Sequence, residues 1–416
     1  MENDDVEYGR VPNEAEPFEI LLRCVESGKK CVEKRPSICM VPSVLRNLSE
    51  KSFIPRVVSI GPLHKENENL KKFEWLKHSF LYDLLSRSSD PTLAEQLNEC
   101  LEKVNDLIED IRSSYDDMIK EKYKGRIDQL AHMMVLDASF ILEFCLKQEY
   151  KQDNKEATML SKIQITCIAI DLLLLENQIP FFVLQTIFDC TINRKGSHQE
   201  NYLTCLLQKI LGKYIHPFAQ CTKDSEDTEH AQCSDDSKKE SEHAHVLDCL
   251  HKTYKVKTSE KVGDCQASLN YNHSVVELDR SGVNFKPQKE KEMEMSMSII
   301  KSRSCYNLSP WSKRTLFMPT LVIQEFTETV LRNFIAYEQF SPEVNYYFTS
   351  YASAMDMLID SEADVGKLVE SKVIVNNLGS NRDVATVING ICVNIEIERF
   401  CYSEAIQELD RFFRPC

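Results

Sequence analysis

Three carboxylates stand inside strongly apolar stretches of this 416-residue chain. Asp171 and Glu176 flank four consecutive leucines in the string DLLLLENQIPFFVL, residues 171–184. Asp137 falls on the apolar face of a helical pattern, because apolar residues precede it by four and follow it by three and four. Buried acids whose surroundings separate their pKa values can act as a general acid and a general base. Acid–base catalysis is therefore one function that these residues could carry.

A structural network is the other interpretation of the same carboxylates. Buried polar groups must be hydrogen-bonded, and neighbouring polar side chains and helix ends supply the partners. We favour this interpretation because no glycine loop, nucleophile elbow or metal-binding helix accompanies the acids. The predicted structural polar network consists of Arg46, Asp137, Asp171, Glu176, Asn177 and Gln178. On this interpretation, removing the Asp171 side chain destabilises the fold.

Catalytic motifs are missing from the sequence. It contains no GxSxG, GxGxxG, P-loop or HExxH string, and these are the local signatures of acyl-transfer, dinucleotide, phosphate and zinc chemistry. We therefore predict that the protein is not an enzyme and holds no cofactor. A cryptic enzyme that uses the buried carboxylates stays open as an alternative. A solvent-accessible pocket joining Asp137, Asp171 and Glu176 would favour it, and sealed, fully hydrogen-bonded carboxylates would exclude it.

Cysteine and histidine side chains recur between residues 221 and 251. The candidate metal ligands are Cys221, His230, Cys233, His243, His245, Cys249 and His251. Structural zinc sites usually hold their ligands as close pairs in an ordered knuckle, whereas these spacings are long and the segment is acidic. We predict a solvated linker and no metal site.

The charge balance argues against nucleic acid as a partner. The chain has 50 basic and 65 acidic residues and a net charge of −15, so it would repel a phosphate backbone. The opening MENDDVEYGR lacks the apolar run of a secretory signal. The 16 cysteines, which include no CxxC pair, are therefore expected to be reduced thiols, several of them buried.

Apolar periodicity predicts a mainly α-helical fold, a single large helical body with a few short extended segments. Glycine is scarce, with 11 residues, which favours helices over turn-rich sheets. The expected helices cover residues 70–84, 93–118, 127–147, 160–177, 180–188, 202–211, 245–254, 327–340 and 347–358, and two more follow the capping boxes at 361–364 and 380–383. Residues 53–64 and 316–323 are expected to be extended, as is the VNF string at 283–285.

No stretch of 18 uncharged apolar residues occurs in the sequence, so we expect no membrane span in this chain. The most apolar stretch, residues 163–188, is interrupted by Asp171, Glu176 and Pro180. It predicts a buried helix pair, since a membrane span needs at least 18 apolar residues with few or no charges.

Four parts of the chain differ in composition. Residues 1–37 are polar and predict a flexible lead, and residues 219–244 carry many acids and no large apolar side chain, which predicts a disordered insertion. Residues 286–310 are rich in Met, Lys and Ser and are also expected to be mobile. Residues 38–218 and 245–416 should form two halves of one domain. We expect the turn at 176–178 and the SIGP string at 59–62 to lie near their junction.

Eleven strings in order resemble the plant-specific "domain of unknown function 247" family, also described as UPF0481-like. They cover roughly residues 38–390 and are VPSVLR, VSIGPLH, LKKFEWLK, MMVLDASFILEF, DLLLLENQIPFFVL, HVLDCLH, VELDRSGVNFKP, MPTLVI, LRNFIAYEQ, YASAMDMLIDSEADVGKLVESKVIVNNLGS and VATVIN. The resemblance implies a mainly helical plant protein with no established enzymatic activity.

The resemblance also implies how such a protein works. Some family members act as pollen-side determinants of self-incompatibility in grasses, so recognition or signalling by protein contact is the implied role, with family relatives or membrane receptors as candidate partners. Members usually end in one transmembrane helix, which implies the plasma membrane, whereas this chain ends at LDRFFRPC. That ending leaves open a cytoplasmic location, and an anchorless decoy that competes with anchored relatives is a further alternative.

Overall fold

The structure is a computed structural model of the whole chain. The residues it describes are 19, 21–22, 36–88, 91–153, 160–194, 196, 198–199, 201–215, 217–218, 243–254, 256, 273–288, 295–301, 314–341 and 343–413. Residues 37–416 form one compact unit, and all elements below belong to this second unit of the chain. The predicted flexible lead and the predicted disordered insertion lie almost wholly outside the described residues.

The chain enters the second unit as an irregular segment with two short helical turns. Pro42 precedes α2 (Ser43–Arg46), and η1 (Glu50–Ser52) follows. Proline suits this place because its fixed φ already matches the start of a helix. Residues 53–64 then run without helix or strand and are mostly buried. The side chains of the polar network hold this segment, as shown below.

The next helices break where one long helix was predicted. After α3 (Glu68–Lys71) and α4 (Glu74–Leu85), residues 93–118 form α5 (Leu93–Asp106) and α6 (Ile108–Ser113), and α7 (Asp117–Lys122) starts within them. The prediction of a single helix was wrong because backbone and capping bonds interrupt it. The Ser114 carbonyl accepts a hydrogen bond from the Ile38 amide at 3.0 Å, and Asp116 caps α7 through the Ile119 amide.

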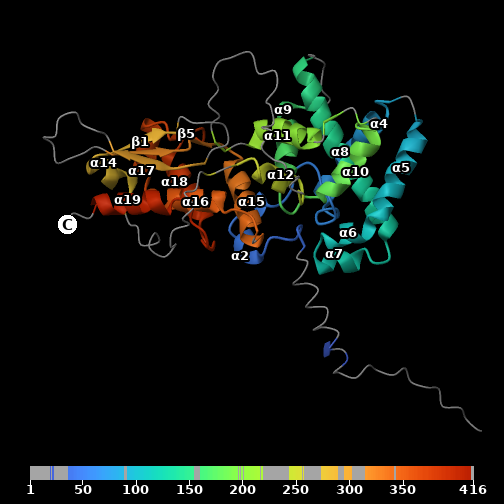
Figure 1. Ribbon diagram of the computed structural model, residues 1–416, viewed down its shortest axis with the longest axis horizontal. Helices are drawn as coiled ribbons and strands as arrows, with labels where there is room; N and C mark the ends of the chain where they lie inside the picture. The colour runs from blue at the N-terminus through green and yellow to red at the C-terminus, as the bar shows by residue number, and fades with distance from the viewer. Residues whose placement is uncertain are drawn as a thin grey trace, which may run out of the picture. The chain divides into compact units, whose positions relative to one another are not determined.

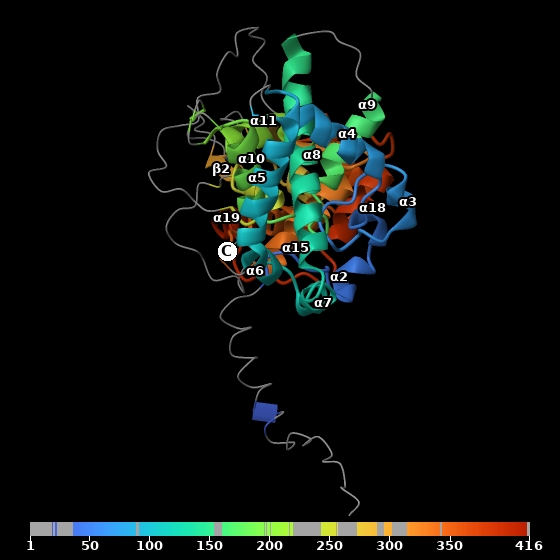
Figure 2. The same cartoon turned by 90° about the vertical axis from the view of Figure 1, so that its right-hand side faces the viewer.

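Helix α8 (Ile127–Asp153) is the centre of the first half. It packs against α4, α5, α10 (Phe181–Thr191) and α11 (Tyr202–Ile215), and Figure 2 shows it among these helices. Its residues 127–150 are long and apolar enough to cross a membrane, but 83% of their most apolar window is buried inside the protein. That burial is typical of a core helix.

Helix α9 (Lys162–Asp171) is shorter than the predicted helix over residues 160–177. A loop occupies 172–180, because the side chains of Asn177 and Gln178 fold back onto the carbonyls of residues 171, 172 and 174. The carbonyls of residues 171 and 174 also accept the backbone amides of Leu174 and Asn177, so side-chain and backbone donors together satisfy the end of the helix. Pro180 then precedes α10, as predicted.

The second half begins with α12 (Val246–His251) and α14 (Val275–Arg280). A three-stranded sheet follows in the order β1-β3-β2, from β1 (Val283–Pro287), β2 (Ser298–Lys301) and β3 (Arg314–Met318). Strand β1 is parallel to β3, and β2 is antiparallel to it. The described part of residues 286–310, expected to be mobile, includes β2, so that prediction was wrong there because these residues pair with β3.

A second, smaller sheet pairs β4 (Leu321–Ile323) in parallel with β5 (Ile374–Asn376). The remaining helices are α15 (Thr327–Phe340), α16 (Tyr347–Leu358), α17 (Glu362–Glu370), α18 (Asn381–Ile391) and α19 (Ser403–Phe413). Phe334 of α15 stacks on Phe348 of α16 with ring centroids 4.1 Å apart. Figure 1 shows these elements, and they confirm the predicted mainly α fold.

Cysteines largely follow the expectation of reduced thiols. Eight described cysteines are free, and Cys100, Cys145, Cys190 and Cys249 among them are buried. Cys205 departs from the expectation, because it is disulfide-bonded.

Candidate functional site

We call residues 38–64, the irregular stretch before α3, the entry segment. Asp171, the last residue of α9, binds the backbone of this entry segment. Its two carboxylate oxygens accept hydrogen bonds from the amides of Arg56, Val57 and Val58 at 2.9, 2.7 and 3.0 Å. The residue is 0% exposed, and no cationic side chain pairs with it among the described residues. Burial raises the pKa of Asp171 to about 7, although the three amides favour the charged form.

Asn177 binds the same segment as a strand neighbour would. Its Oδ1 accepts from the Ile60 amide at 2.7 Å, and its Nδ2 donates to the Val58 carbonyl at 3.1 Å. The same amide nitrogen donates to the Asp171 carbonyl at 2.9 Å. Asn177 therefore joins the end of α9 to the entry segment with every polar atom of its side chain in use.

Gly61 lets the entry segment approach the 172–180 loop closely. Its φ is +70°, and a Cβ at this position would lie 2.4 Å from the Gln178 carbonyl oxygen. Only glycine fits a left-handed conformation against a backbone atom at that distance. The Gln178 carbonyl instead accepts the Tyr115 hydroxyl at 3.1 Å, and the Gln178 side-chain oxygen accepts the Leu247 amide at 3.3 Å.

Glu176 anchors the start of the entry segment. Its Oε1 accepts from the Val41 amide at 2.9 Å, and the Arg46 guanidinium reaches both of its oxygens. His64 Nε2 lies 3.0 Å from Oε2. Glu176 is 0% exposed, so this charge is buried with its counter-charge beside it.

Asp137 on α8 is paired with a buried cation from α4. Its Oδ1 accepts from Lys77 Nζ at 2.6 Å, and its Oδ2 accepts from the Gly61 amide at 2.8 Å. Lys77 is also 0% exposed and lies 3.1 Å from Glu74. Burial raises the pKa of Asp137, and the charge of Lys77 opposes that rise.

The six residues of the predicted network therefore lie around one short stretch of chain. Arg46 is on α2 and meets Glu176, while Asp137, Asp171 and Asn177 bind the backbone of residues 56–61. Gln178 satisfies the end of α9 and reaches α12. The arrangement can fix the path of the entry segment. The three carboxylates are each 0% exposed.

Several buried polar residues that serve the same purpose were missed from the sequence. Asn333 of α15 accepts from the Leu175 amide at 2.9 Å and donates to the Ser52 carbonyl at 2.7 Å. Lys77 was missed because a lysine in an amphipathic helix usually faces water. Asn333 could have been found, since it stands among the apolar residues of LRNFIAYEQ.

A second buried cluster joins α12 to α15 and α16. Glu338 accepts from the amides of Phe348 and Thr349 at 2.9 and 2.7 Å and lies 2.8 Å from His251 Nε2. A carboxylate at this position satisfies the free amides of the first turn of α16 and favours the helix dipole. Asp248 accepts the Tyr337 hydroxyl at 2.8 Å and pairs with Lys252 at 2.8 Å.

Two of the candidate zinc ligands that the structure describes, His245 and His251, have other hydrogen-bond partners. His245 Nδ1 accepts from the Asp248 amide at 3.2 Å and so caps α12, while His251 meets Glu338. Burial lowers the pKa of His245 to about 4. Cys221, His230 and Cys233 lie outside the described residues. No group of three potential metal ligands occurs in the described part of the chain.

The enzyme alternative predicts a solvent-accessible pocket that joins the three carboxylates. The carboxylates of Asp137, Asp171 and Glu176 are buried and hydrogen-bonded, and no residue of the network lines the pocket beside Tyr214 or the pocket beside Arg382. These contacts meet the condition set above as counting against catalysis by the three acids.

Comparison with known proteins places the chain among plant sequences. It is 28% identical over 387 residues to UPF0481 protein At3g47200 of Arabidopsis thaliana, covering 88% of this chain and 74% of the relative. It is 22% identical over 456 aligned positions to the putative UPF0481 protein At3g02645 of the same plant, covering 91% and 82% of the two chains. No solved structure is significantly similar to it.

The family match covers nearly everything described above. The matching family model is described as "Plant protein of unknown function" and spans residues 38–416, from the start of the entry segment through α19. That span contains all the network residues. The chain therefore belongs to the plant family of proteins of unknown function designated DUF247.

Proposed function

We propose that this protein acts by contacting other proteins, in recognition or signalling, rather than by catalysing a reaction. The observation that carries this proposal is the use of its buried carboxylates. Asp137, Asp171 and Glu176 accept hydrogen bonds from backbone amides and internal cations, and each is 0% exposed. Groups that could have done chemistry thus hold the fold, which leaves the surface as the place of action.

One helix presents a surface suited to contact. Trp75, His78 and Tyr82 recur at i, i+3 and i+7 on α4, so they share one face of the helix. Trp75 is 55% and Tyr82 62% exposed. The opposite face carries Leu76 and Phe80, which are buried in the core. We call Trp75, His78 and Tyr82 the α4 ridge.

The chemistry of the α4 ridge indicates what kind of partner fits it. Tryptophan and tyrosine are the residues most enriched at binding hot spots, whereas apolar residues exposed singly are ordinary. Lys72, three residues before Trp75, is exposed and forms no ion pair within the described residues. A protein with an apolar pocket and an acidic rim would complement this surface. A second copy of this chain fits less well, since each copy carries a net charge of −15.

The candidate partners come from the family resemblance. We propose membrane receptors or family relatives, met at the plasma membrane, and a role of the self-incompatibility type or one related to it. This part of the proposal rests on the resemblance alone. Identification of the captured protein decides between the two classes of partner.

The experiment is differential capture from plant tissue. Tagged wild-type protein is compared with Trp75→Ala/Tyr82→Ala and with Met118→Ala/Ile163→Ala, in which the removed side chains are each 62% exposed but lie on α7 and α9. We expect the same partner with wild type and control, and its loss with the ridge variant. A partner retained by the ridge variant would exclude the α4 ridge, and substrate turnover by the purified protein would contradict the proposed function.

A further inference from the structure

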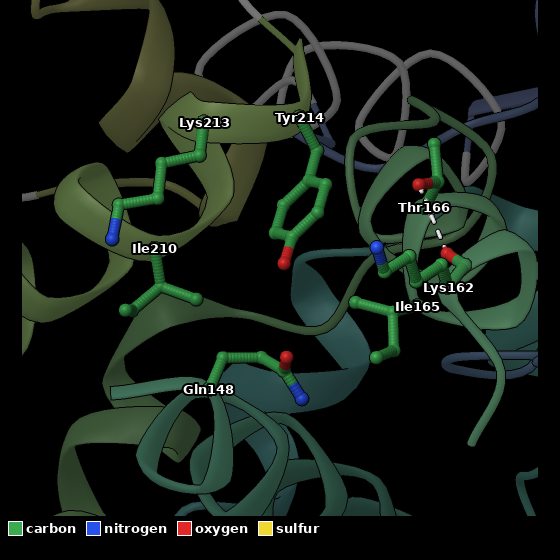
Figure 3. A pocket seen from close by; sticks show the side chains of 7 residues that line it. All are labelled: Gln148, Lys162, Ile165, Thr166, Ile210, Lys213 and Tyr214. Carbon is green, nitrogen blue, oxygen red and sulfur yellow. Dashed lines mark hydrogen bonds between the residues drawn. The ribbon is translucent and has the colours of Figure 1, made fainter. Parts of the chain in front are cut away.

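A cavity of about 340 Å³ lies where α8, α9 and α11 meet (Figure 3). Its lining residues are Gln148, Lys162, Ile165, Thr166, Ile210, Lys213 and Tyr214. No residue of the polar network or of the α4 ridge lines it. A cavity of this size is at the lower end of the range for small-molecule sites.

The charge around this cavity is opposite to that of the whole protein. Lys162 and Lys213 are exposed, and neither forms an ion pair with any residue that the structure describes. By contrast, the neighbouring Lys209 pairs with Glu149 at 3.2 Å. No acidic residue lines the cavity. In a chain with a net charge of −15, two unpaired cations beside one cavity favour a negatively charged ligand.

The other side chains that line the cavity indicate what further chemical groups a ligand would have. The Tyr214 hydroxyl points into the cavity, with the two lysines on either side of its ring (Figure 3). Burial raises the pKa of Tyr214, so the phenol stays protonated and can donate a hydrogen bond. Ile165 and Ile210 give the cavity apolar walls. Cations and a neutral donor suit an anionic head, and the isoleucines suit an apolar body.

We propose that this cavity binds a small organic anion, whose carboxylate or phosphate is held by Lys162, Lys213 and the Tyr214 hydroxyl while its apolar part lies against Ile165 and Ile210. A lysine ammonium is a compact charge that accepts either anionic group. The site is independent of the α4 ridge, so the protein could bind such a ligand and a protein partner at different places.

Calorimetric titration of the full chain tests the proposal with two probes. Benzoate offers a carboxylate on an apolar ring, and inorganic phosphate offers the other head group, each at an ionic strength matched with sodium chloride. We expect binding of at least one probe, and none of the neutral analogue benzamide. The probe that binds tells a carboxylate ligand from a phosphate ligand.

Matched variants locate the binding. Lys162→Gln/Lys213→Gln should weaken it by about tenfold or more, because two charge-assisted bonds are lost. The control Lys209→Gln/Lys120→Gln removes two lysines that are already paired with Glu149 and Asp117, and it should bind as wild type does. Tyr214→Phe keeps all charges and should weaken binding by several-fold, which tests the site even if the double variant folds poorly.

Three results would overturn the proposal. The first is that wild type binds neither anion at a concentration of roughly 10 mM, which would correspond to a weak affinity. The second is that the Lys209→Gln/Lys120→Gln control weakens binding as much as Lys162→Gln/Lys213→Gln does. The third is that wild type binds benzamide as tightly as benzoate. Circular dichroism of each variant confirms that the helices are intact.

Discussion

At the scale of single residues, this protein uses charged side chains as anchors for backbone. Asp171 accepts hydrogen bonds from three consecutive backbone amides. Glu176 accepts hydrogen bonds from one backbone amide and from the Arg46 side chain. Asp137 accepts hydrogen bonds from one backbone amide and from the Lys77 side chain. A buried donor left without an acceptor costs about 1–3 kcal/mol. Each carboxylate therefore stabilises a stretch of chain that has no helix or strand of its own.

Asp171→Ala should lower the free energy of unfolding by about 4 kcal/mol, because three amides, two of them in buried hydrogen bonds, lose their acceptor. Asp171→Asn keeps one acceptor oxygen but turns an NH2 group toward amide donors, so we expect a smaller loss. Denaturant unfolding of both variants measures the difference. A melting temperature equal to that of wild type would remove Asp171 from the structural role.

His245 should make the fold sensitive to acid. Its folded pKa is lowered to about 4 from 6.5 by burial, so between these pH values the unfolded chain binds a proton that the folded chain does not. Stability from this group is complete above pH 6.5 and is lost as the pH falls toward 4, by about 3 kcal/mol in all.

His245→Asn keeps an acceptor for the Asp248 amide and cannot titrate. The curve of unfolding free energy against pH should therefore be flatter for this variant than for wild type between pH 6.5 and 4. Parallel curves in that window would show that His245 is not held neutral in the fold.

At the scale of elements, close approach of the entry segment to the 172–180 loop depends on one glycine. Gly61→Ala should cost about 3 kcal/mol or more, since the new Cβ meets a backbone oxygen in addition to an unfavourable φ. Gly379→Ala is the matched control: its φ is +89° but open space surrounds it, so we expect a cost of only about 1 kcal/mol. Equal losses in thermal melts would show that the contact with Gln178 does not matter.

Asn333 joins α15 to two segments of the first half. Its hydrogen-bond donor can be replaced by an acceptor with almost no change in the shape of the side chain. Asn333→Asp replaces the nitrogen that donates to the Ser52 and Thr329 carbonyls with an oxygen. We expect a loss of about 3 kcal/mol at neutral pH. The exposed Asn69→Asp should change the unfolding free energy by less than about 0.5 kcal/mol. Similar values for the two variants would contradict the account.

Apolar periodicity predicted most helices, and capping boxes predicted where two more begin. The ranges of α15 and α16 match the prediction, and Ser361 and Ser380 precede α17 and α18 as expected. The pattern failed at residues 93–118 because apolar spacing continues through the break. The second of the two breaks, between α6 and α7, lies beside a backbone bond from Ile38, which is distant in the sequence.

The sequence was enough to predict which residues form the polar network, but it did not predict their hydrogen-bond partners. Apolar surroundings marked Asp137, Asp171 and Glu176 as buried, since polar groups there must be satisfied. The groups that donate hydrogen bonds to these carboxylates include backbone amides within residues 41 and 56–61. A backbone amide cannot be recognised from the residue type in the sequence. Lys77 and Asn333 were hidden for a related reason, because their roles appear only once α4, α8 and α15 are packed.

At the scale of the whole molecule, side chains from both halves meet at the same loop. Leu175 of that loop binds Asn333 of α15, and Gln178 binds the Leu247 amide of α12. The polar network is therefore continuous with the contact between residues 38–218 and 245–416. We infer that loss of the network loosens both halves together, whereas the α4 ridge can change without affecting the core.

The measurement that tests this account most directly is partner capture set against unfolding free energy for two variants in parallel. Asp171→Asn, assayed below its melting temperature, should lose stability while its folded molecules capture the partner as wild type does. Trp75→Ala/Tyr82→Ala should keep its stability and lose the partner. If the ridge variant kept the partner, or if folded Asp171→Asn lost it, the division between a structural core and a recognising surface would be wrong.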